Sequence, residues 1–189
     1  MISTPRTAAT ALTMALVLAA MAPAASAAQS GGGMYLGGMF NIGIAENANA
    51  KEASNPVSGT FLIGTKLNPS FLLEGRASLG LATGEAPQWG GGDLETKLKH
   101  AVGGYGRYLI PVSPTMDAYG LFGATYGRVA TRSVPGGRWE AMNDLSPSLG
   151  FGLDIKVSPG FGIMVEYASL MDNGAWNYDA ISVGFVGRF

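Results

Sequence analysis

The sequence predicts an all-β protein, an eight-stranded antiparallel up-and-down transmembrane β-barrel, and three observations support this prediction. Apolar and polar residues alternate with a period of two in one stretch after another, as in β-strands that have two different faces. After the N-terminal segment, there is no apolar run of about 18 residues or more that would form a transmembrane helix. The connections between the alternating stretches are short and long in turn, which is typical of transmembrane β-barrels.

The strands are expected at roughly 33–45, 57–67, 71–82, 96–110, 116–130, 144–157, 160–171 and 178–189. Each is long enough for the about 9–11 residues that a tilted transmembrane strand needs. Proline-containing tight turns separate some of them, because proline presets φ and has no N–H to lose. These turns are 68–70, 111–114 and 158–160. Longer connections, rich in Gly, Asn, Asp and Glu, are expected at 46–56, 83–95, 131–143 and 172–177.

Residues 1–27 are expected to be a secretory signal peptide. Arg6 precedes an apolar run from Ala11 to Ala22, and small residues follow at Ala25, Ser26 and Ala27, where a signal peptidase would cut. The remainder, 28–189, is expected to be a single outer-membrane β-barrel domain.

The composition excludes several classes of function. Charged residues make up 13% of the chain, about half the share of a soluble domain. A formal net charge of −1 argues against a nucleic-acid partner, which would require a basic surface. The absence of cysteine excludes a disulfide scaffold, and the single histidine excludes most histidine-based metal sites. We therefore expect no cofactor and no metal site.

The two faces of the strands predict an inside-out barrel. Leu, Ile, Val and Phe share one face, whereas the other carries mainly Gly and Ser, which fit the narrow lumen of an eight-stranded barrel. The apolar face is therefore expected to contact lipid. A cluster of charged side chains is expected to pair inside the lumen; its members are Glu74, Arg76, Arg107, Asp154 and Glu166.

Aromatic residues are expected to form two belts at the membrane interfaces, where their amphipathic rings are favoured. The belt at the long connections would comprise Trp89, Trp139 and Trp176. The belt at the tight turns would include Tyr35, Phe71, Tyr108, Tyr119 and Phe161.

The last residues, from Ile181 to Phe189, carry apolar or aromatic side chains at alternate positions and end on phenylalanine. With this C-terminal pattern, the chain resembles the small outer-membrane β-barrel proteins of Gram-negative bacteria, the OmpA/OmpX-like, porin-type group. Residues 104–108 also resemble this group, although they are a less specific match. The resemblance implies that Val183, Phe185 and Phe189 form a C-terminal signal for the outer-membrane assembly machinery. It also implies a bacterial outer-membrane location among lipid and lipopolysaccharide. An even strand number would place both termini in the periplasm, and we expect a monomer.

Three functions are compatible with such a barrel. The first is a non-enzymatic structural or interaction role, in which a plugged barrel anchors loops that meet an unknown surface partner. The second is a narrow channel with a preference for anions, because eight basic residues have an inward phase against three acidic ones. The basic residues are Lys66, Arg76, Lys97, Lys99, Arg107, Arg128, Lys156 and Arg188, and the acidic ones are Glu74, Asp154 and Glu166.

The third function is a lipid A-modifying enzyme, for which the only candidate base is His100. Its phase places it on the outer face near the long connections, where a lipid substrate would lie. However, its expected neighbours on that face are Leu98 and Val102, and neither supplies a nucleophile. An interfacial histidine at the level of the headgroups accounts for His100 better, and we favour that interpretation.

Overall fold

The computed structural model describes residues 33–48, 50–89, 91–172, 174 and 176–189. The expected signal peptide, 1–27, lies outside these residues. All regular elements of the described residues are strands, and none is a helix long and apolar enough to cross a membrane. The strands are β1 (Met34–Asn47), β2 (Val57–Asn68), β3 (Phe71–Ala82), β4 (Gly84–Pro87), β5 (Asp93–Ser113), β6 (Met116–Val134), β7 (Glu140–Ser158), β8 (Phe161–Asp172) and β9 (Trp176–Arg188).

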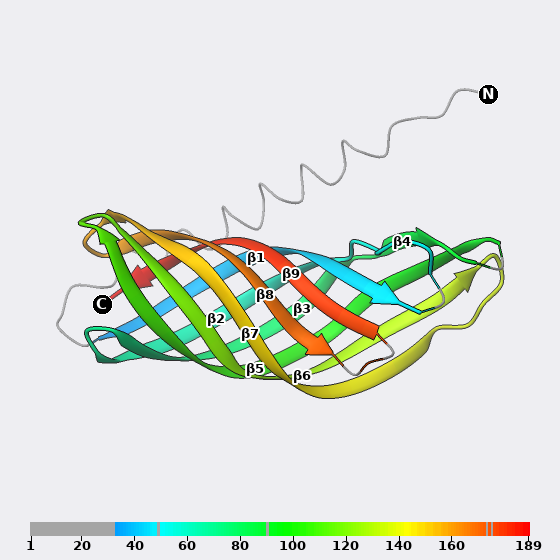
Figure 1. Ribbon diagram of the computed structural model, residues 1–189, viewed down its shortest axis with the longest axis horizontal. Helices are drawn as coiled ribbons and strands as arrows, with labels where there is room; N and C mark the ends of the chain where they lie inside the picture. Colours follow the sequence, from blue (N-terminus) through cyan, green and yellow to red (C-terminus); the bar gives the residue numbers. More distant parts are fainter. Residues whose placement is uncertain (1–32, 49, 90, 173, 175) are drawn as a thin grey trace, which may run out of the picture.

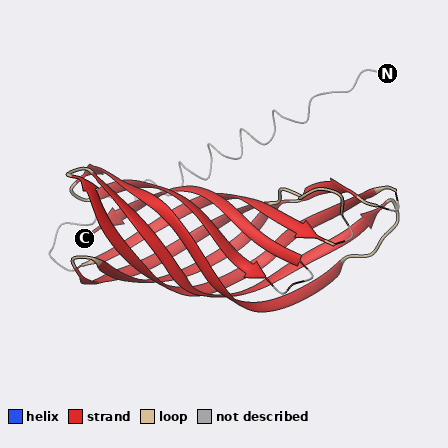
Figure 2. Ribbon diagram, viewed as in Figure 1, coloured by secondary structure: helices blue, strands red, loops and turns tan. Residues whose placement is uncertain are grey.

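The strands form a closed antiparallel barrel (Figures 1 and 2). Each strand pairs with its neighbours in the chain, and β1 pairs with β9 from Tyr35–Arg188 to Asn47–Trp176. β3 and β4 both pair with β5, one after the other, so that together they form a single wall strand. The barrel therefore has eight wall strands, and the predicted fold class is confirmed.

The two ends of the barrel differ. At the turn end, β2–β3, β5–β6 and β7–β8 are joined by tight turns, and β1 begins where β9 ends. Asn68 stabilises the first of these turns, because its side-chain oxygen accepts hydrogen bonds from the backbone N–H groups of Ser70 and Phe71, both at 2.9 Å. The longer connections lie at the opposite end, the loop end, where β4 and the ends of β5 and β6 extend past the other strands (Figure 1).

This extension is a difference from the sequence prediction. The expected connections 83–95 and 131–143 are in large part paired strand, with Glu85 opposite Glu95, and Glu95 opposite Arg132. One face of this segment is still buried, since Ala86 and Leu94 are 2% and 6% exposed, but its outward positions carry charged residues such as Glu95. The outward side therefore does not show the apolar residues that contact with lipid would require. The alternation that identifies the membrane part of a strand is therefore lost in the part that projects.

Side chains sort between the two faces as an inside-out barrel requires. Large apolar side chains such as Leu79, Leu149 and Phe151 point outward, with exposed fractions of 64%, 68% and 65%. The interior buries polar and charged groups, including Glu74 and Arg107. The exposed apolar surface forms a band around the barrel, as a protein that contacts lipid must have.

An irregularity in β5 changes the phase of the strand. The register with β6 shifts between Leu98 and His100, which leaves Lys99 as an extra residue in β5. As a result Leu98 points inward and is 3% exposed, while Lys97 and Lys99 take the outward phase. The prediction that Lys97 and Lys99 face the lumen is therefore wrong.

Arg128 was also expected in the lumen, and this expectation is wrong for a simpler reason. In β6 the inward positions are odd-numbered, and Leu121, Thr125 and Val129 are all buried. Arg128 lies between two inward positions and is exposed.

Glycines in the wall make room for tyrosine rings in the lumen. A Cβ atom at Gly64 would lie 2.2 Å from Cζ of Tyr35, and one at Gly152 would lie 2.6 Å from Cζ of Tyr119. Each ring thus lies flat over a glycine of the adjacent strand. In a lumen this narrow, an inward tyrosine requires a neighbour without a side chain.

We predict that Gly64→Ala destabilises the barrel by about 1–3 kcal/mol, because the new methyl group displaces Tyr35. The matched control is Gly104→Ala in β5, where an added Cβ meets nothing within 4 Å. Urea unfolding of the two variants in lipid vesicles measures the difference. Equal stability of both variants would show that the space over Gly64 is not needed.

Candidate functional site

A continuous chain of ion pairs fills the middle of the lumen. Arg76 forms a two-pronged contact with Glu166, with Nη1–Oε1 at 2.5 Å and Nη2–Oε2 at 2.8 Å, and it also pairs with Glu74. Arg107 forms ion pairs with two carboxylates, with Glu74 at 3.0 Å and with Asp154 at 3.5 Å. The structure thus brings all five residues of the expected lumen cluster into contact.

Arg188 extends this chain toward the turn end, because it forms an ion pair with Asp154. A separate pair, Lys156 with Asp117 at 2.8 Å, lies close to the same opening. Asp117 was not assigned to the lumen from the sequence, although its phase matches that of Tyr119 and Leu121, which are also buried. The phase that placed Arg128 in the lumen would have put Asp117 outside, so only the corrected phase of β6 identifies it.

Three tyrosines complete the network. Tyr35 donates a hydrogen bond to Glu74 at 2.8 Å, and Tyr119 donates one to Glu166 at 2.9 Å. The guanidinium of Arg107 lies 4.0 Å from the ring centroid of Tyr119, and that of Arg76 lies 4.9 Å from the ring of Tyr105. Tyr35 and Tyr119 were expected at the membrane interface, and their burial in the lumen shows that this prediction is wrong.

The network connects opposite walls of the barrel. β3, which carries Arg76, and β8, which carries Glu166, lie on opposite sides of the closed strand order. With the tyrosines included, β1, β3, β5, β6, β7, β8 and β9 all contribute a side chain. The interactions therefore cross the lumen as well as following its wall.

The network is balanced in charge, since three arginines meet three carboxylates. The expected basic excess in the lumen included Lys97, Lys99 and Arg128, which face outward, and left out Asp117, which faces inward. The predicted anion preference loses most of its basis with these corrections.

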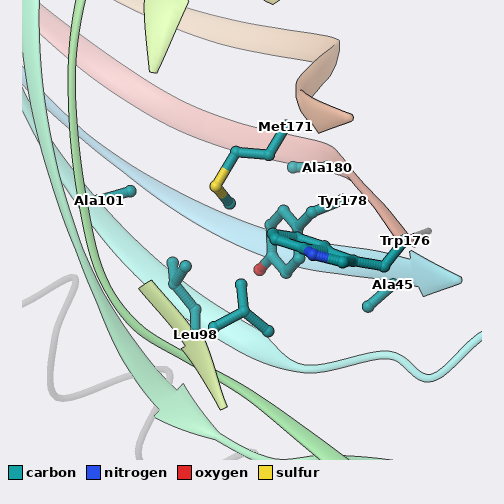
Figure 3. Close-up of a cluster of buried hydrophobic side chains, with 8 residues drawn as sticks. Ala45, Leu98, Ala101, Met171, Trp176, Tyr178 and Ala180 are labelled. Atoms are coloured by element: carbon teal, nitrogen blue, oxygen red, sulfur yellow. The ribbon is translucent and has the colours of Figure 1, made fainter. Parts of the chain in front are cut away.

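A second, apolar layer closes the lumen nearer the loop end (Figure 3). The side chains of Met171, Tyr178 and Trp176 lie against Leu98 from β5 across the lumen and against Ala45 from the neighbouring β1. Trp176 is 6% exposed, so the prediction that it belongs to an interfacial belt is wrong. Its position at the start of β9, within the lumen phase shared with Tyr178, explains why it turns inward.

Little space remains between the two layers. A cavity of about 20 Å³ lies beside Arg76, Tyr105 and Glu166, which is room for about one water molecule. A larger pocket of about 760 Å³ opens at the turn end, where Asp117, Asp154, Lys156 and Arg188 contribute to its lining.

The other residues of the expected belts do lie outside the lumen. Trp89 is 70% exposed in the β4–β5 connection, and Tyr108 is exposed on β5. Phe71 contacts Phe122 with ring centroids 5.9 Å apart, and Phe161 stacks on Phe185 at 6.4 Å. Trp139 is half-buried and lies between two cationic side chains on the outer face, those of Lys97 and Arg132.

Comparison with known proteins identifies the family. Residues 11–189 match the family model for the outer membrane protein beta-barrel domain. The chain belongs to this family. Its location in the bacterial outer membrane follows from the family and the fold. A search of curated protein sequences gives no match.

Several solved structures of outer-membrane proteins have a fold similar to that of this chain. The attachment invasion locus protein Ail of Yersinia pestis is 18% identical with a TM-score of 0.58, over 85% of this chain and 100% of Ail. Neisserial surface protein A is 13% identical with a TM-score of 0.62, again over 85% of this chain and 100% of the other. The N-terminal β-barrel domain of OprF from Pseudomonas aeruginosa is 12% identical with a TM-score of 0.51, over the same shares.

The C-terminal residues of the barrel complete its closure. The backbone N–H of Phe189 donates a hydrogen bond to the carbonyl of Met34 at 3.1 Å, beyond the last pair of β1 and β9. Val183 is exposed on the outer face, and Phe185 is half-buried under the ring of Phe161. Recognition of these three residues by an assembly machinery stays a prediction.

His100 lies on the outer face, opposite Leu79 on β3 and Arg128 on β6. Val102 shares this face as expected, but Leu98 does not, because the extra residue Lys99 separates the two phases. Within the described ranges, His100 has no hydrogen bond to a serine or a carboxylate. The same ranges contain no group of three or more His, Cys, Asp or Glu residues that could hold a metal ion.

We predict that Glu74→Gln lowers the free energy of unfolding by about 3–5 kcal/mol, because two buried arginines lose their shared carboxylate. The control is Glu95→Gln, which removes the partner of the half-exposed Arg132 on the projecting hairpin and should shift the unfolding midpoint in urea far less. A midpoint shift of equal size in both variants would contradict a structural role specific to the lumen network.

Proposed function

We propose that the protein is a closed, non-enzymatic membrane anchor that presents its loop end to partners at the cell surface. The observation that carries this proposal is the contact of Arg76 with Glu166 across the lumen. An ion that passed this point would have to separate a buried, two-pronged ion pair. Such a separation leaves unpaired charges in a site of low polarity, at a cost of several kcal/mol.

The apolar layer strengthens the proposal, since it closes the lumen at a second level. Met171 and Val129 are fully buried there, and their apolar side chains offer a passing ion little replacement for its water shell. The ion-pair network contains equal numbers of arginines and carboxylates, which argues against a channel selective for anions. Among the described residues, His100 has Arg128 beside it and no hydrogen-bonded nucleophile, which favours a non-enzymatic role.

We further propose that the turn end faces the periplasm and the loop end faces the outside. The described chain begins and ends at the turn end, where short turns leave little surface for recognition. The projecting β5–β6 hairpin provides such a surface at the other end. Short periplasmic turns and longer external loops are general features of outer-membrane barrels.

Lipid and lipopolysaccharide are the expected surroundings, and an unknown molecule would meet the loops. Ail has been solved in complex with the heparin analogue sucrose octasulfate, so a barrel of similar fold has a ligand of this kind. This supports a binding role for the present chain without identifying its ligand. We infer a monomer, because the outward apolar band is continuous and suits contact with lipid all around.

We predict that the refolded protein gives no conductance steps in a planar lipid bilayer. The double variant Arg76→Ala, Glu166→Ala removes both sides of the crossing contact and should give steps or an increased leak, if circular dichroism shows that it is folded. Reproducible steps from the unaltered protein would overturn the proposal of a closed anchor.

The orientation can be tested with single cysteines, because the natural sequence has none. We expect Arg138→Cys, in the exposed β6–β7 connection, to react with a membrane-impermeant maleimide on intact cells. Ser158→Cys, exposed at the turn end, should react only after the outer membrane is permeabilised. The reverse pattern would refute the proposed orientation.

The terminal residue tests the proposed assembly signal. We expect Phe189→Ala to reduce the amount of protein assembled in the outer membrane of cells, because a signal for the assembly machinery would be incomplete. Refolding of the same variant into pure lipid vesicles serves as the control and should be nearly normal. If both were equally impaired, Phe189 would act through barrel stability alone.

A further inference from the structure

Four basic side chains lie together on the outer face of β5 and β6: Lys97, Lys99, His100 and Arg128, here called the basic patch. All four are in the outward phase, and His100 is directly opposite Arg128 in the ladder. The extra residue at Lys99 allows two consecutive residues, Lys99 and His100, to be exposed. The irregularity thus increases the density of basic groups on this face.

The basic patch borders the apolar band. His100 pairs with Leu79, and the next outward position of β5 is Val102, which pairs with Tyr126. Tyr126 in turn pairs with Leu145, which is 69% exposed. On the turn-end side of the patch, the outer face is therefore apolar over β3, β5, β6 and β7.

The charges of the basic patch are not neutralised by the protein. Among the described residues, no carboxylate lies within ion-pair distance of these four side chains. Glu95, the nearest acid along β5, is held by Arg132 at 2.7 Å. Lys97 is repelled by the like charges of Lys99 and Arg132. An anion bound here would relieve that repulsion.

The ring of Trp139 lies against the basic patch and contacts the side chain of Lys97. The ammonium group of Lys97 lies 3.8 Å from the ring centroid of Trp139, and the guanidinium of Arg132 lies 4.8 Å from it. Ala130 pairs with Lys97 and is fully buried even though it has the outward phase. Stacking on an aromatic ring restricts the lysine side chain, so less entropy is lost when it binds an anion.

We propose that the basic patch binds the phosphate groups of lipopolysaccharide, whose acyl chains lie along the adjacent apolar face of β3, β5, β6 and β7. A phosphorylated lipid fits both halves of this surface, because its charged headgroup and its hydrocarbon chains are joined in one molecule. A soluble anion would use the patch alone and would leave the apolar face to bulk lipid. The inference rests on the proposed orientation, in which the loop end lies in the leaflet that contains lipopolysaccharide.

The test measures binding of lipopolysaccharide to the refolded full chain in phosphatidylcholine nanodiscs. The test variant is Lys99→Gln, Arg128→Gln, and the control is Lys51→Gln, Lys66→Gln, which removes the same charge from exposed sites outside the basic patch. Loss of two cations near an anionic lipid should weaken binding about 30-fold. The control variant should bind like the unaltered protein, and circular dichroism shows whether each variant is folded.

Two further probes distinguish a lipid ligand from other anions. Lipopolysaccharide with its phosphates removed should bind the unaltered protein as weakly as intact lipopolysaccharide binds the test variant. Sucrose octasulfate, which has no acyl chains, should bind much more weakly than lipopolysaccharide. Equal binding by the test and control variants, no effect of removing the phosphates, or equally tight binding of sucrose octasulfate would each overturn the proposal.

These outcomes are separate from those that test the anchor and its orientation. Nanodiscs expose both ends of the barrel to the same lipid mixture, so binding to the basic patch does not depend on how the protein is inserted in cells. If lipopolysaccharide did not bind at the basic patch, the conclusions from the conductance and labelling experiments would therefore not change.

Discussion

The backbone hydrogen bonds between β1 and β9 are the constraint on which the rest of the structure depends. Lipid offers no partner to N–H and C=O groups, so a sheet that spans the membrane has to close on itself. Closure with eight strands leaves a lumen about as wide as the side chains that fill it. The inward positions hold small residues, rings that lie over a glycine as Tyr35 does over Gly64, apolar side chains that pack into a layer as Leu98 does, or charges that find a partner.

The ion-pair network is a response to that narrow interior. A charged side chain turned into the lumen has little water around it, and it is tolerated only when a neighbour of opposite charge and suitable shape is present. Arg76 meets this condition through Glu166 and Glu74, and Arg107 meets it through Glu74 and Asp154. The arginines also lie against tyrosine rings, which replace part of the lost hydration.

The alternation of residue types predicted the fold and the phase of most strands, because lipid on one side and a small lumen on the other impose opposite requirements. It placed Glu74, Arg76 and Glu166 in one interior without any knowledge of their contacts. It failed at Lys97, because a one-residue irregularity reverses a phase and leaves no mark in composition. The belt prediction failed at Tyr119 because it used only the position of the residue near a strand end. The ring fits in the lumen because Gly152 in the next strand leaves room for it, and this relation needs the register.

The crossing contacts have a consequence for the order of events in folding. Arg76 and Glu166 are separated by 90 positions in the chain, and Arg107 and Asp154 by 47. A partly inserted barrel that contains β3 but not yet β8 would hold arginines whose partners have not arrived. Such intermediates are unstable in a bilayer, so the wall strands should assemble in one cooperative step, and the high sequence separation of the contacts should make that step slow.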